Sequence, residues 1–348
     1  MYSVVFIKLN GQAMIRILSA LFFLSFSSLL VAKETVNIAI VETLSVDIVT
    51  ESRLAFVDEL QRLLPEKHIQ FSVYNAQASE QMATDILAAI ASQSPPDLVV
   101  SVATLATRAL HSADALIQTP KLFMVVSAPV EEGIVSALGE VSSRNITGEA
   151  HVLDAKVKLD MLDGILRASN ISEPLSIALI HSTYPSSTNS VNQLMALEHE
   201  YENIDLVAIS TPFIEGHDGL LRMSSDITAS LHQFEGKLDG YWLSSGPLVE
   251  LDGLVDNIFN ETELLPLFAE NIEAVQEGAL LGVVSEPQSI GKSAAKKAKR
   301  ILERKSAEGI PVTKMDTYTV AVNVSTAIKL KLPIPSNYLK LSKNHIYQ

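Results

Sequence analysis

The chain has 348 residues, of which 47% are hydrophobic and 19% charged, and its formal net charge is −14. This length suits two domains of ordinary size, and the composition is that of a globular protein rather than a disordered one. The acidic excess argues against nucleic acid and anionic membrane surfaces as partners, because both attract basic surfaces. The absence of cysteine excludes disulfides, thiolate metal sites and a lipid anchor attached at a cysteine.

Residues 1–32 have the pattern of a secretory signal peptide. Arg16 precedes the apolar segment Ile17–Phe26, and Leu30-Val31-Ala32 offers a cleavage site after Ala32. A transmembrane anchor is the alternative, because the apolar run is nearly long enough to span a bilayer. The polar residues 33–35 directly after the site favour cleavage. An exported protein of this size without disulfides fits the Gram-negative periplasm, which is the location we expect.

Residues 33–148 alternate short, β-branched apolar runs with amphipathic segments. We expect strands at Val36–Val41, Ile69–Tyr74, Asp97–Val102 and Leu122–Val126. We expect a helix that is capped by Ser45 or Asp47 and runs to about Leu64, and further helices at Glu80–Ala91 and Ala103–His111. This order predicts a parallel sheet with helices on both faces.

The segment 122–152 is expected to lead the chain from a first lobe to a second. Its apolar run Leu122–Val126 predicts a buried strand, which breaks at Ser127-Ala128-Pro129. We expect a helix-like segment after the break and a second strand at Asn145–Gly148. A ligand cleft is expected between the two lobes.

The pattern of strands and helices then restarts. We expect strands at Ser176–Ile180, Leu206–Ile209, Leu238–Leu243, Leu265–Phe268, Ala279–Val284 and Val320–Val324. The expected helices are Lys156–Leu166, Val191–Tyr201, Gly219–Phe234 and Ser289–Glu303, and residues 325–348 are expected to form a surface tail. The predicted fold class is therefore α/β, with two doubly wound parallel-sheet lobes joined by hinge crossings.

The loops after the expected strands are the predicted ligand site. Ligands of parallel sheets bind at the carboxyl ends of the strands, where helix N-termini present free N–H groups. Most of these loops are rich in serine and threonine and few contain charge, which suits a small carboxylate. The candidate ligand-binding residues in them are Glu42, Thr43, Ser45, Thr104, Ser127, Glu149, Ser187, Thr188, Asn189 and Ser244.

Other kinds of site have no support in the sequence. The eight histidines show no metal-binding spacing, and no glycine-rich phosphate loop is present. Ser244-Ser245-Gly246 is not the G-x-S-x-G elbow of hydrolases. We therefore expect neither an enzyme nor a cofactor or metal site. His181 is expected to be a hydrogen-bonded loop residue, with a ligand contact as the alternative, and Trp242 is expected to lie in the core.

Several motifs resemble one known family. Leu98–Ala106, Lys121–Val135 and Arg144–Gly148 resemble the substrate-binding proteins of ABC transporters typified by tryptophan and tyrosine binders. Ser187–Ser190 and Val320–Pro335 are similar to later motifs of the same family, and they occur in the same order. Each motif is weak alone, whereas the set covers most of the chain.

This resemblance implies a periplasmic-binding-protein type I fold. Lobe 1 would comprise residues 33–148 and 273–315, and lobe 2 would comprise residues 149–272 and 316–348. The lobes would close on a small molecule, such as an amino acid or related carboxylate, and deliver it to an ABC permease. We expect a monomer. The alternative is a periplasmic sensory subunit of the same fold, which signals to a membrane receptor kinase or cyclase.

One departure from the family bears on the ligand. The resemblance places an aspartate at position 128, where it could hold the ammonium of an amino acid, but this chain has Ala128. Glu42, Glu149 or Glu286 would then have to hold the cation; Glu286 follows the strand expected at Ala279–Val284. Otherwise the ligand is not an α-amino acid.

Overall fold

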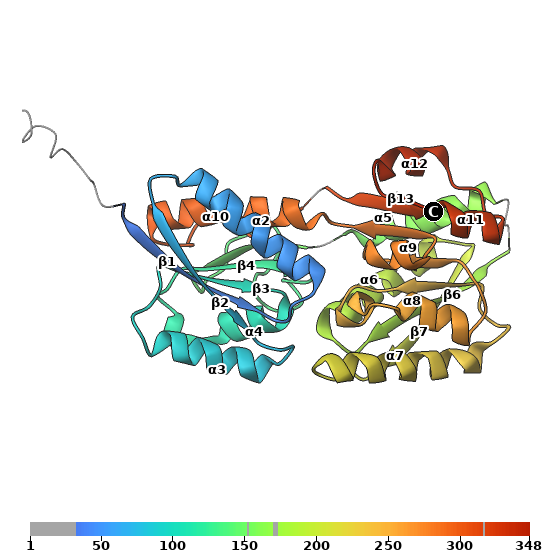
Figure 1. Ribbon diagram of the computed structural model, residues 1–348, viewed down its shortest axis with the longest axis horizontal. Coiled ribbons are helices and arrows are strands. Elements are labelled where there is room, and N and C mark those ends of the chain that lie inside the picture. Colours follow the sequence, from blue (N-terminus) through green and yellow to red (C-terminus); the bar gives the residue numbers. More distant parts are fainter. Residues whose placement is uncertain (1–32, 152, 170–172, 316) are drawn as a thin grey trace, which may run out of the picture.

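The computed structural model describes residues 33–348, apart from residues 152, 170–172 and 316. The predicted signal peptide therefore lies outside the described residues. Two α/β lobes lie side by side and are joined along one side by crossing segments (Figure 1). In the described part of the chain, no helix is long and apolar enough to cross a membrane.

The first lobe has a six-stranded sheet in the order β11-β5-β4-β3-β1-β2, and its neighbouring strands are parallel. The strands are β1 (Thr35–Glu42), β2 (His68–Asn75), β3 (Leu98–Val102), β4 (Lys121–Val126), β5 (Ile146–Ala150) and β11 (Thr313–Lys314). Its helices are α2 (Asp47–Leu63), α3 (Glu80–Ala91), α4 (Thr104–Ser112) and α10 (Pro287–Arg304).

Alternation along the strands explains why both faces of this sheet are covered. Ile38 and Ile40 of β1 pack in the cluster formed with α2 and α10. Ala39 and Val41 point to the other face and pack in the cluster formed with α3 and α4. Successive side chains of a strand point to opposite faces, so a continuous apolar strand needs helices on both sides.

The second lobe has a seven-stranded sheet in the order β13-β12-β10-β9-β8-β6-β7, and only the β10–β12 pair is antiparallel. The strands are β6 (Leu175–Ser182), β7 (Ile204–Thr211), β8 (Gly240–Leu243), β9 (Leu267–Ala269), β10 (Leu281–Val284), β12 (Thr319–Asn323) and β13 (Ile346–Tyr347). Its helices are α5 (Ala155–Ala168), α6 (Pro185–Leu197), α7 (His217–Leu231), α8 (Leu254–Glu261), α9 (Glu273–Glu277), α11 (Val324–Leu330) and α12 (Ser336–Ser342).

The crossings between the lobes differ from the expected boundaries at two places. β5 continues to Ala150 and stays in the first sheet, beside β4. Residues 273–284 belong to the second lobe, because β10 pairs with β9 and β12 there. The chain returns to the first lobe only with α10. The last crossing lies between β11, which ends at Lys314, and β12, which begins at Thr319. These two strands flank the expected boundary at residue 315.

The segment between β4 and β5 contains turns rather than the expected helix. Ile134 and Val135 both donate their N–H groups to the carbonyl of Pro129. Both side chains are buried in a small cluster with Phe123. Because β4 and β5 are neighbours in one sheet, this segment does not connect the lobes. The first crossing to the second lobe comes only after β5.

The start of α6 and the capping of α2 differ from what the sequence predicted. α6 begins at Pro185 instead of Val191, because the fixed φ of proline suits the first position of a helix. Ser187, Thr188 and Asn189 therefore lie in a helical turn and not in a loop. α2 follows the N-cap Val46, and no side chain caps it, so neither Ser45 nor Asp47 has the predicted capping role.

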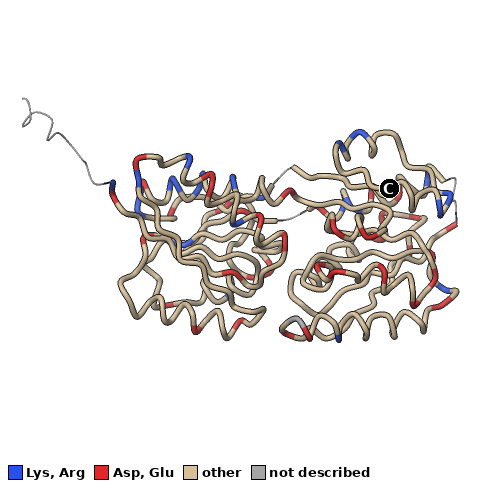
Figure 2. The backbone as a smooth tube through the Cα atoms, in the orientation of Figure 1, with Lys and Arg blue, Asp and Glu red and all other residues tan. Residues whose placement is uncertain are grey.

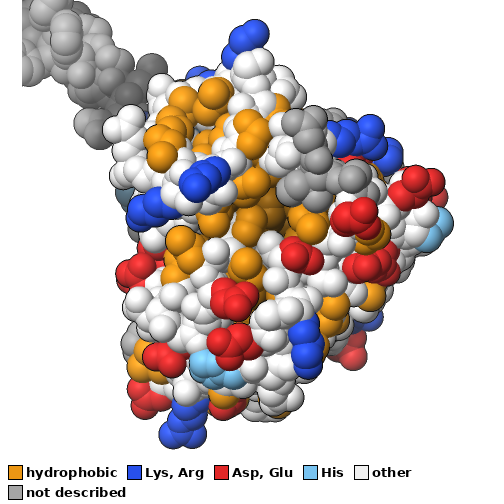
Figure 3. Space-filling model, turned by 90° about the vertical axis from the view of Figure 1, so that its right-hand side faces the viewer, with side chains coloured by type: hydrophobic (Ala, Val, Ile, Leu, Met, Phe, Trp, Pro, Cys, Tyr) orange, Lys and Arg blue, Asp and Glu red, His pale blue; other side chains and the backbone are white. Residues whose placement is uncertain are grey.

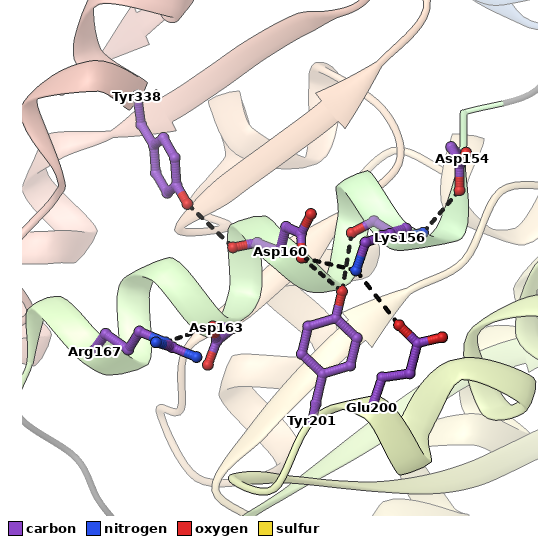
Figure 4. A network of polar contacts seen from close by, with 8 residues as sticks. All are labelled: Asp154, Lys156, Asp160, Asp163, Arg167, Glu200, Tyr201 and Tyr338. Carbon is purple, nitrogen blue, oxygen red and sulfur yellow. Dashed lines mark hydrogen bonds and ion pairs between the residues drawn. The ribbon is translucent and has the colours of Figure 1, made fainter.

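The C-terminal residues are not a loose tail. β13 pairs with β12 at the edge of the second sheet. The Tyr338 hydroxyl on α12 donates to the carbonyl of Asp160 at 3.3 Å, and Figure 4 shows this contact on α5 beside the ion pairs of that helix. Hydrophobic side chains gather on this end of the second lobe (Figure 3), and Ile328 is 71% exposed.

Candidate ligand-binding cleft

A cavity, here called the central cavity, lies between the lobes. Both lobes contribute to its wall, and the lining includes Leu44, Val46, Val49, Ala103, Thr104, Val125, Ser127, His151, Tyr184, Ser186, Ser245, Gly246, Pro247, Glu250 and Glu270. An inner cavity shares Ser127, His151, Ser245 and Glu270 with it. The cleft therefore lies at the carboxyl ends of the strands of both sheets, as expected for such folds.

Unusual backbone conformations shape the wall of the first lobe. Ala103 directly follows β3 and has a φ of 69°, and Val125 in β4 has a φ of 60°. A positive φ is uncommon for residues other than glycine and is strained for a β-branched one. The register of β4 against β5 shifts between Met124 and Val126. This irregularity ends the regular pairing just before Ser127, which lines the cavity.

Thr43 supports this wall without lining the central cavity. It is fully buried, and its hydroxyl oxygen accepts a 3.0 Å hydrogen bond from the N–H of Ala106. That N–H belongs to the first turn of α4 and has no partner within the helix. Thr43 therefore stabilises the start of α4, whose first residue, Thr104, lines the central cavity.

A close approach between the loop after β8 and the start of α6 shapes the wall of the second lobe. Gly246 has a φ of 138°, and a Cβ atom there would lie 2.0 Å from Oγ of Ser187. Glycine is therefore required where the loop after β8 crosses the start of α6. This contact buries Ser187, whereas its neighbour Ser186 and Ser245 line the central cavity.

A buried polar network lies at the floor of the cleft. Glu270 accepts hydrogen bonds from Nζ of Lys158 at 2.7 Å and Nε1 of Trp242 at 2.9 Å. Ser190 donates to the same carboxylate at 2.8 Å. Burial alone would raise the pKa of Glu270, but Lys158 and the hydrogen bonds outweigh it and lower the pKa. Glu270 is therefore ionised and its charge is balanced.

Three other polar side chains of the central cavity are buried without a hydrogen-bond partner in the described part of the chain. They are the hydroxyls of Ser127 and Tyr184 and Nδ1 of His151. The Tyr184 hydroxyl lies close to Thr43 and the backbone of Leu105, outside hydrogen-bond geometry. Burial, followed by Lys158, lowers the pKa of His151 to about 4. Its ring is neutral at neutral pH and can accept or donate a hydrogen bond.

Glu250 is the other carboxylate of the central cavity. It ends the short 3₁₀ helix Pro247–Glu250 that follows β8. Burial raises its pKa to about 8, and the carboxylates of Glu273 and Asp47 contribute. Asp47 is the first residue of α2 in the first lobe. Carboxylates from both lobes are thus close enough to repel one another.

Direct contacts also join the lobes beside the cleft. Nδ2 of Asn189 on α6 lies 3.4 Å from Oε1 of Glu132 in the first lobe. Nε2 of Gln193, one turn further along α6, lies 3.3 Å from Oε1 of Glu131. Arg108 on α4 forms an ion pair with Glu132. The two contacts from α6 hold the walls of the cleft together, and the ion pair of Arg108 fixes Glu132 within the first lobe.

The structure brings some predicted site residues to the cleft. Thr104 and Ser127 line the central cavity, and Asn189 lines the inner one. Ser45 lines a more open cavity at the mouth, and Glu286 lines an acidic cavity beside the central one. The predicted residues that line none of these cavities are Glu42, Thr43, Glu149, Ser187, Thr188 and Ser244.

Two predicted cation binders already have partners within the first lobe. Glu42 lies 2.5 Å from Nε of Arg53. Glu149 lies 3.1 Å from Nζ of Lys297 and accepts hydrogen bonds from Ser293 and Thr313. Both carboxylates are nearly inaccessible to solvent. Their charges are therefore balanced by other parts of the protein and not available to a ligand.

Sequence reasoning missed Lys158, His151, Glu250 and Glu270. Glu270 directly follows β9, so the rule that selected the other loops could also have selected this residue. His151 follows β5 in the same way. Nothing in the sequence marks Lys158 or Glu250. Trp242, expected in the core, is 1% exposed and stacks on Phe268, and His181 contacts the Ser182 carbonyl at 2.9 Å.

Comparisons with known proteins agree with this architecture. A tyrosine-binding protein of Clostridioides difficile (strain R20291) is 26% identical over 287 residues, which cover 80% of this chain and 76% of that protein. An ABC domain from Streptococcus pneumonia in complex with L-Trp has a TM-score of 0.73 at 17% identity, covering 89% of this chain and 99% of that one. A conserved domain protein from Vibrio cholerae has a TM-score of 0.75 at 20% identity, covering 90% and 100%.

The family comparison covers nearly all of the described chain. The model of the ABC transporter substrate binding protein family matches residues 37–346, which confirms the predicted resemblance. The solved structures confirm the predicted type I fold with two α/β lobes. This chain belongs to the family of ABC transporter substrate-binding proteins.

Proposed function

We propose that this protein captures a small organic molecule in the central cavity and delivers it to a membrane permease of an ABC importer. One observation supports this proposal above the others: polar groups from both lobes surround the cavity, and several have no hydrogen-bond partner among the residues that the structure describes. A buried polar group without a partner is unfavourable, so a ligand that binds these groups would stabilise the closed protein.

The setting of this function follows from the family. Substrate-binding proteins of ABC importers are periplasmic or extracellular, and they work with membrane permeases. For this chain we propose a signal peptide that directs export and is cleaved after Ala32, a periplasmic location and action as a monomer. The signal-like pattern of residues 1–32 and the lack of cysteine support the location.

The same fold could serve a sensory subunit that signals to a membrane kinase or cyclase. The observation that favours this second function is Ala128, a buried residue where the importing relatives are expected to bind an ammonium. Uptake of a labelled ligand by cells with and without the gene separates the two functions. Loss of uptake supports transport, and normal uptake with a lost transcriptional or second-messenger response supports sensing.

Binding itself can be tested on the purified protein. A thermal-shift screen over amino acids, amines, sugars and small acids should find a stabilising ligand. At a concentration one hundredfold above its Kd, such a ligand adds about 2.7 kcal/mol to the free energy of unfolding. Trp242 is the single tryptophan and contacts Glu270 in the cleft floor, so its fluorescence should also change.

A matched pair of variants makes the screen specific to the cleft. Ser245→Phe would fill space at a residue that lines both the central and the inner cavity. Ser225→Phe places the same side chain on the exposed surface of α7. We expect Ser245→Phe to abolish the ligand-induced shift and Ser225→Phe to retain it. Equal shifts in both variants would place binding outside the cleft.

A further inference from the structure

The charge of the central cavity indicates which class of ligand it accepts. Among the residues that line this cavity, two are carboxylates, Glu250 and Glu270, and none is lysine or arginine. Glu270 is already paired with Lys158 at 2.7 Å, and both side chains are buried. The charged groups that act on Glu250 are carboxylates as well, those of Glu273 and Asp47. Glu250 therefore has no balancing cation, and a positive charge bound beside it would favour its ionised form.

A neighbouring acidic cavity adds to the negative electrostatic potential of the central cavity. It shares Glu250 and Glu270 with the central cavity and extends between the lobes. Its further acidic lining residues are Asp47, Glu51, Glu273 and Glu286, and its basic group is His345. Figure 2 shows acidic residues on the facing edges of both lobes. Such a field attracts cations and repels anions.

The remaining lining suits an organic molecule rather than a metal ion. Leu44, Val46, Val49, Val125 and Pro247 form an apolar part of the wall. No group of three or more potential ligand side chains in the described residues is arranged to hold a metal ion. Tyr184, which is 2% exposed, presents a hydroxyl without a hydrogen-bond partner among the described residues. A ligand with both apolar and polar parts would fit these surroundings.

The position of the carboxylates also couples binding to closure. Glu250 and Glu273 belong to the second lobe, whereas Asp47 and Glu51 belong to the first. Closing the lobes brings these like charges together, which is unfavourable in a site partly shielded from water. A positive charge placed between them would remove the repulsion and favour the closed form.

We infer that the ligand is an organic cation, with its charged nitrogen beside Glu250 and its apolar part against the wall of the central cavity. This inference rests on the proposed function, because it names the class of molecule that the cleft captures. It also accounts for Ala128. Glu250 of the second lobe holds the positive charge, which lies across from Asp47 of the first lobe, so a carboxylate at position 128 is not needed.

The test compares probes that share one aromatic side chain and differ in whether they contain an ammonium group, a carboxylate or both. Tryptamine, tryptophan and indole-3-propionate form one such set, and tyramine, tyrosine and 3-(4-hydroxyphenyl)propionate form another. In each set we expect thermal stabilisation and calorimetric binding by the amine to exceed those by the amino acid, and no binding of the acid. An amino acid that binds more tightly than its amine, or an acid or neutral sugar that binds in place of the amines, would overturn the inference.

Variants locate the charge. Glu250→Gln should weaken binding of the amine at least tenfold, and Asp256→Asn on the exposed face of α8 should leave it unchanged. Asp47→Asn tests the other lobe and should weaken binding severalfold. Equal affinity in Glu250→Gln and the unchanged protein would contradict the assignment. Binding of another class of small molecule would leave the proposed function standing, whereas failure of every class would contradict that function itself.

Discussion

Nζ of Lys158 lies 2.7 Å from Oε2 of Glu270, and their side chains are 5% and 6% exposed. The two residues come from α5 and from the end of β9, which are distant in the sequence. Their contact neutralises one of the two carboxylates of the central cavity. It thereby distinguishes the paired carboxylate of Glu270 from the carboxyl group of Glu250, which has no cation beside it in the lining of the cavity.

Breaking this pair should destabilise the second lobe. Lys158→Met leaves Glu270 buried without its cation, and Glu270→Gln leaves the ammonium of Lys158 without its anion. Removal of one partner of a buried ion pair lowers the free energy of unfolding by about 3–5 kcal/mol. Urea denaturation followed by circular dichroism measures this change. The double variant Lys158→Met/Glu270→Leu should recover part of the loss, because it leaves neither charge buried.

An exposed pair provides the control. Arg167 and Asp163 form an ion pair one turn apart on α5 (Figure 4), and the side chain of Arg167 is 74% exposed. Arg167→Met should change the free energy of unfolding by less than about 1 kcal/mol, since exposed pairs contribute little. A loss as large as that of Lys158→Met would contradict the assigned difference between the two pairs.

Lys121 should make stability depend on pH in the alkaline range. It is fully buried at the start of β4, and its Nζ has no hydrogen-bond partner in the described part of the chain. Burial, followed by Arg144, lowers its pKa to about 8, against a smaller opposing effect of Asp114. In the unfolded chain the pKa of a lysine is about 10.4. Between these pH values the unfolded state binds more protons, so the free energy of unfolding rises with pH. This gain is absent below about pH 8, where Lys121 is protonated in both states.

The variant Lys121→Met should therefore be more stable than the unchanged protein at pH 7. We expect a gain of about 1–3 kcal/mol, the usual penalty of a buried polar group without a partner. The difference between the two proteins should shrink as the pH rises from about 8 towards 10. Denaturation at several pH values measures it, with the exposed Lys314→Met as the control. A difference that does not vary with pH would refute the role of the buried ammonium.

The sequence predicted local structure better than it predicted partners. Continuous apolar runs such as Val36–Val41 and amphipathic runs such as Glu80–Ala91 determine their own secondary structure, and α3 has the predicted bounds. The crossing points depend on which sheet a strand joins. The apolar sequence of β10 would suit a buried strand of either lobe, and only its pairing with β9 and β12 assigns it to the second. Local patterns contain no information on such a choice.

The same limit explains the errors in the site. Glu42 and Glu149 lie at the carboxyl ends of β1 and β5, where ligand-binding residues of this fold are expected, but their carboxylates are held by Arg53 and Lys297. Lys297 is distant from Glu149 in the sequence, so no local motif links them. Thr104 and Ser127 line the central cavity, because the carboxyl ends of neighbouring parallel strands necessarily lie together.

The contact between Asn189 and Glu132 should contribute to ligand retention. It joins α6 of the second lobe to the first lobe at 3.4 Å. Asn189→Ala removes a hydrogen bond that forms only when the lobes approach, and one such bond contributes about 0.5–1.5 kcal/mol. We expect ligand affinity to fall about two- to tenfold, chiefly through faster dissociation. Stopped-flow fluorescence of Trp242 measures both rate constants.

Gln81→Ala is the matched control for this prediction. Its amide donates to Asp85 at 2.9 Å within α3, so the contact does not join the lobes. The dissociation rate of the ligand should not change in this variant. A similar rate increase in both variants, or a slower association alone in Asn189→Ala, would show that the contact does not retain the ligand.

Gly164 and Tyr338 should be coupled, because the C-terminal helix packs onto α5 at this point. A Cβ atom at position 164 would lie 2.0 Å from the Tyr338 hydroxyl oxygen. Gly164→Ala should therefore lower the free energy of unfolding by about 1–3 kcal/mol, despite the better helix propensity of alanine. Tyr338→Phe alone should lower it by about 1 kcal/mol, through loss of hydrogen bonds to the carbonyls of Asp160 and Met161.

Combining the two changes gives the decisive measurement. In the Tyr338→Phe background the hydroxyl that meets the new methyl group is absent, so Gly164→Ala should be much less destabilising than in the unchanged protein. A double-mutant cycle by urea denaturation should show a coupling of at least about 1 kcal/mol between the two sites. Additive effects would mean that α12 moves away from α5 without loss. The C-terminal residues would then behave as the surface tail that the sequence predicted.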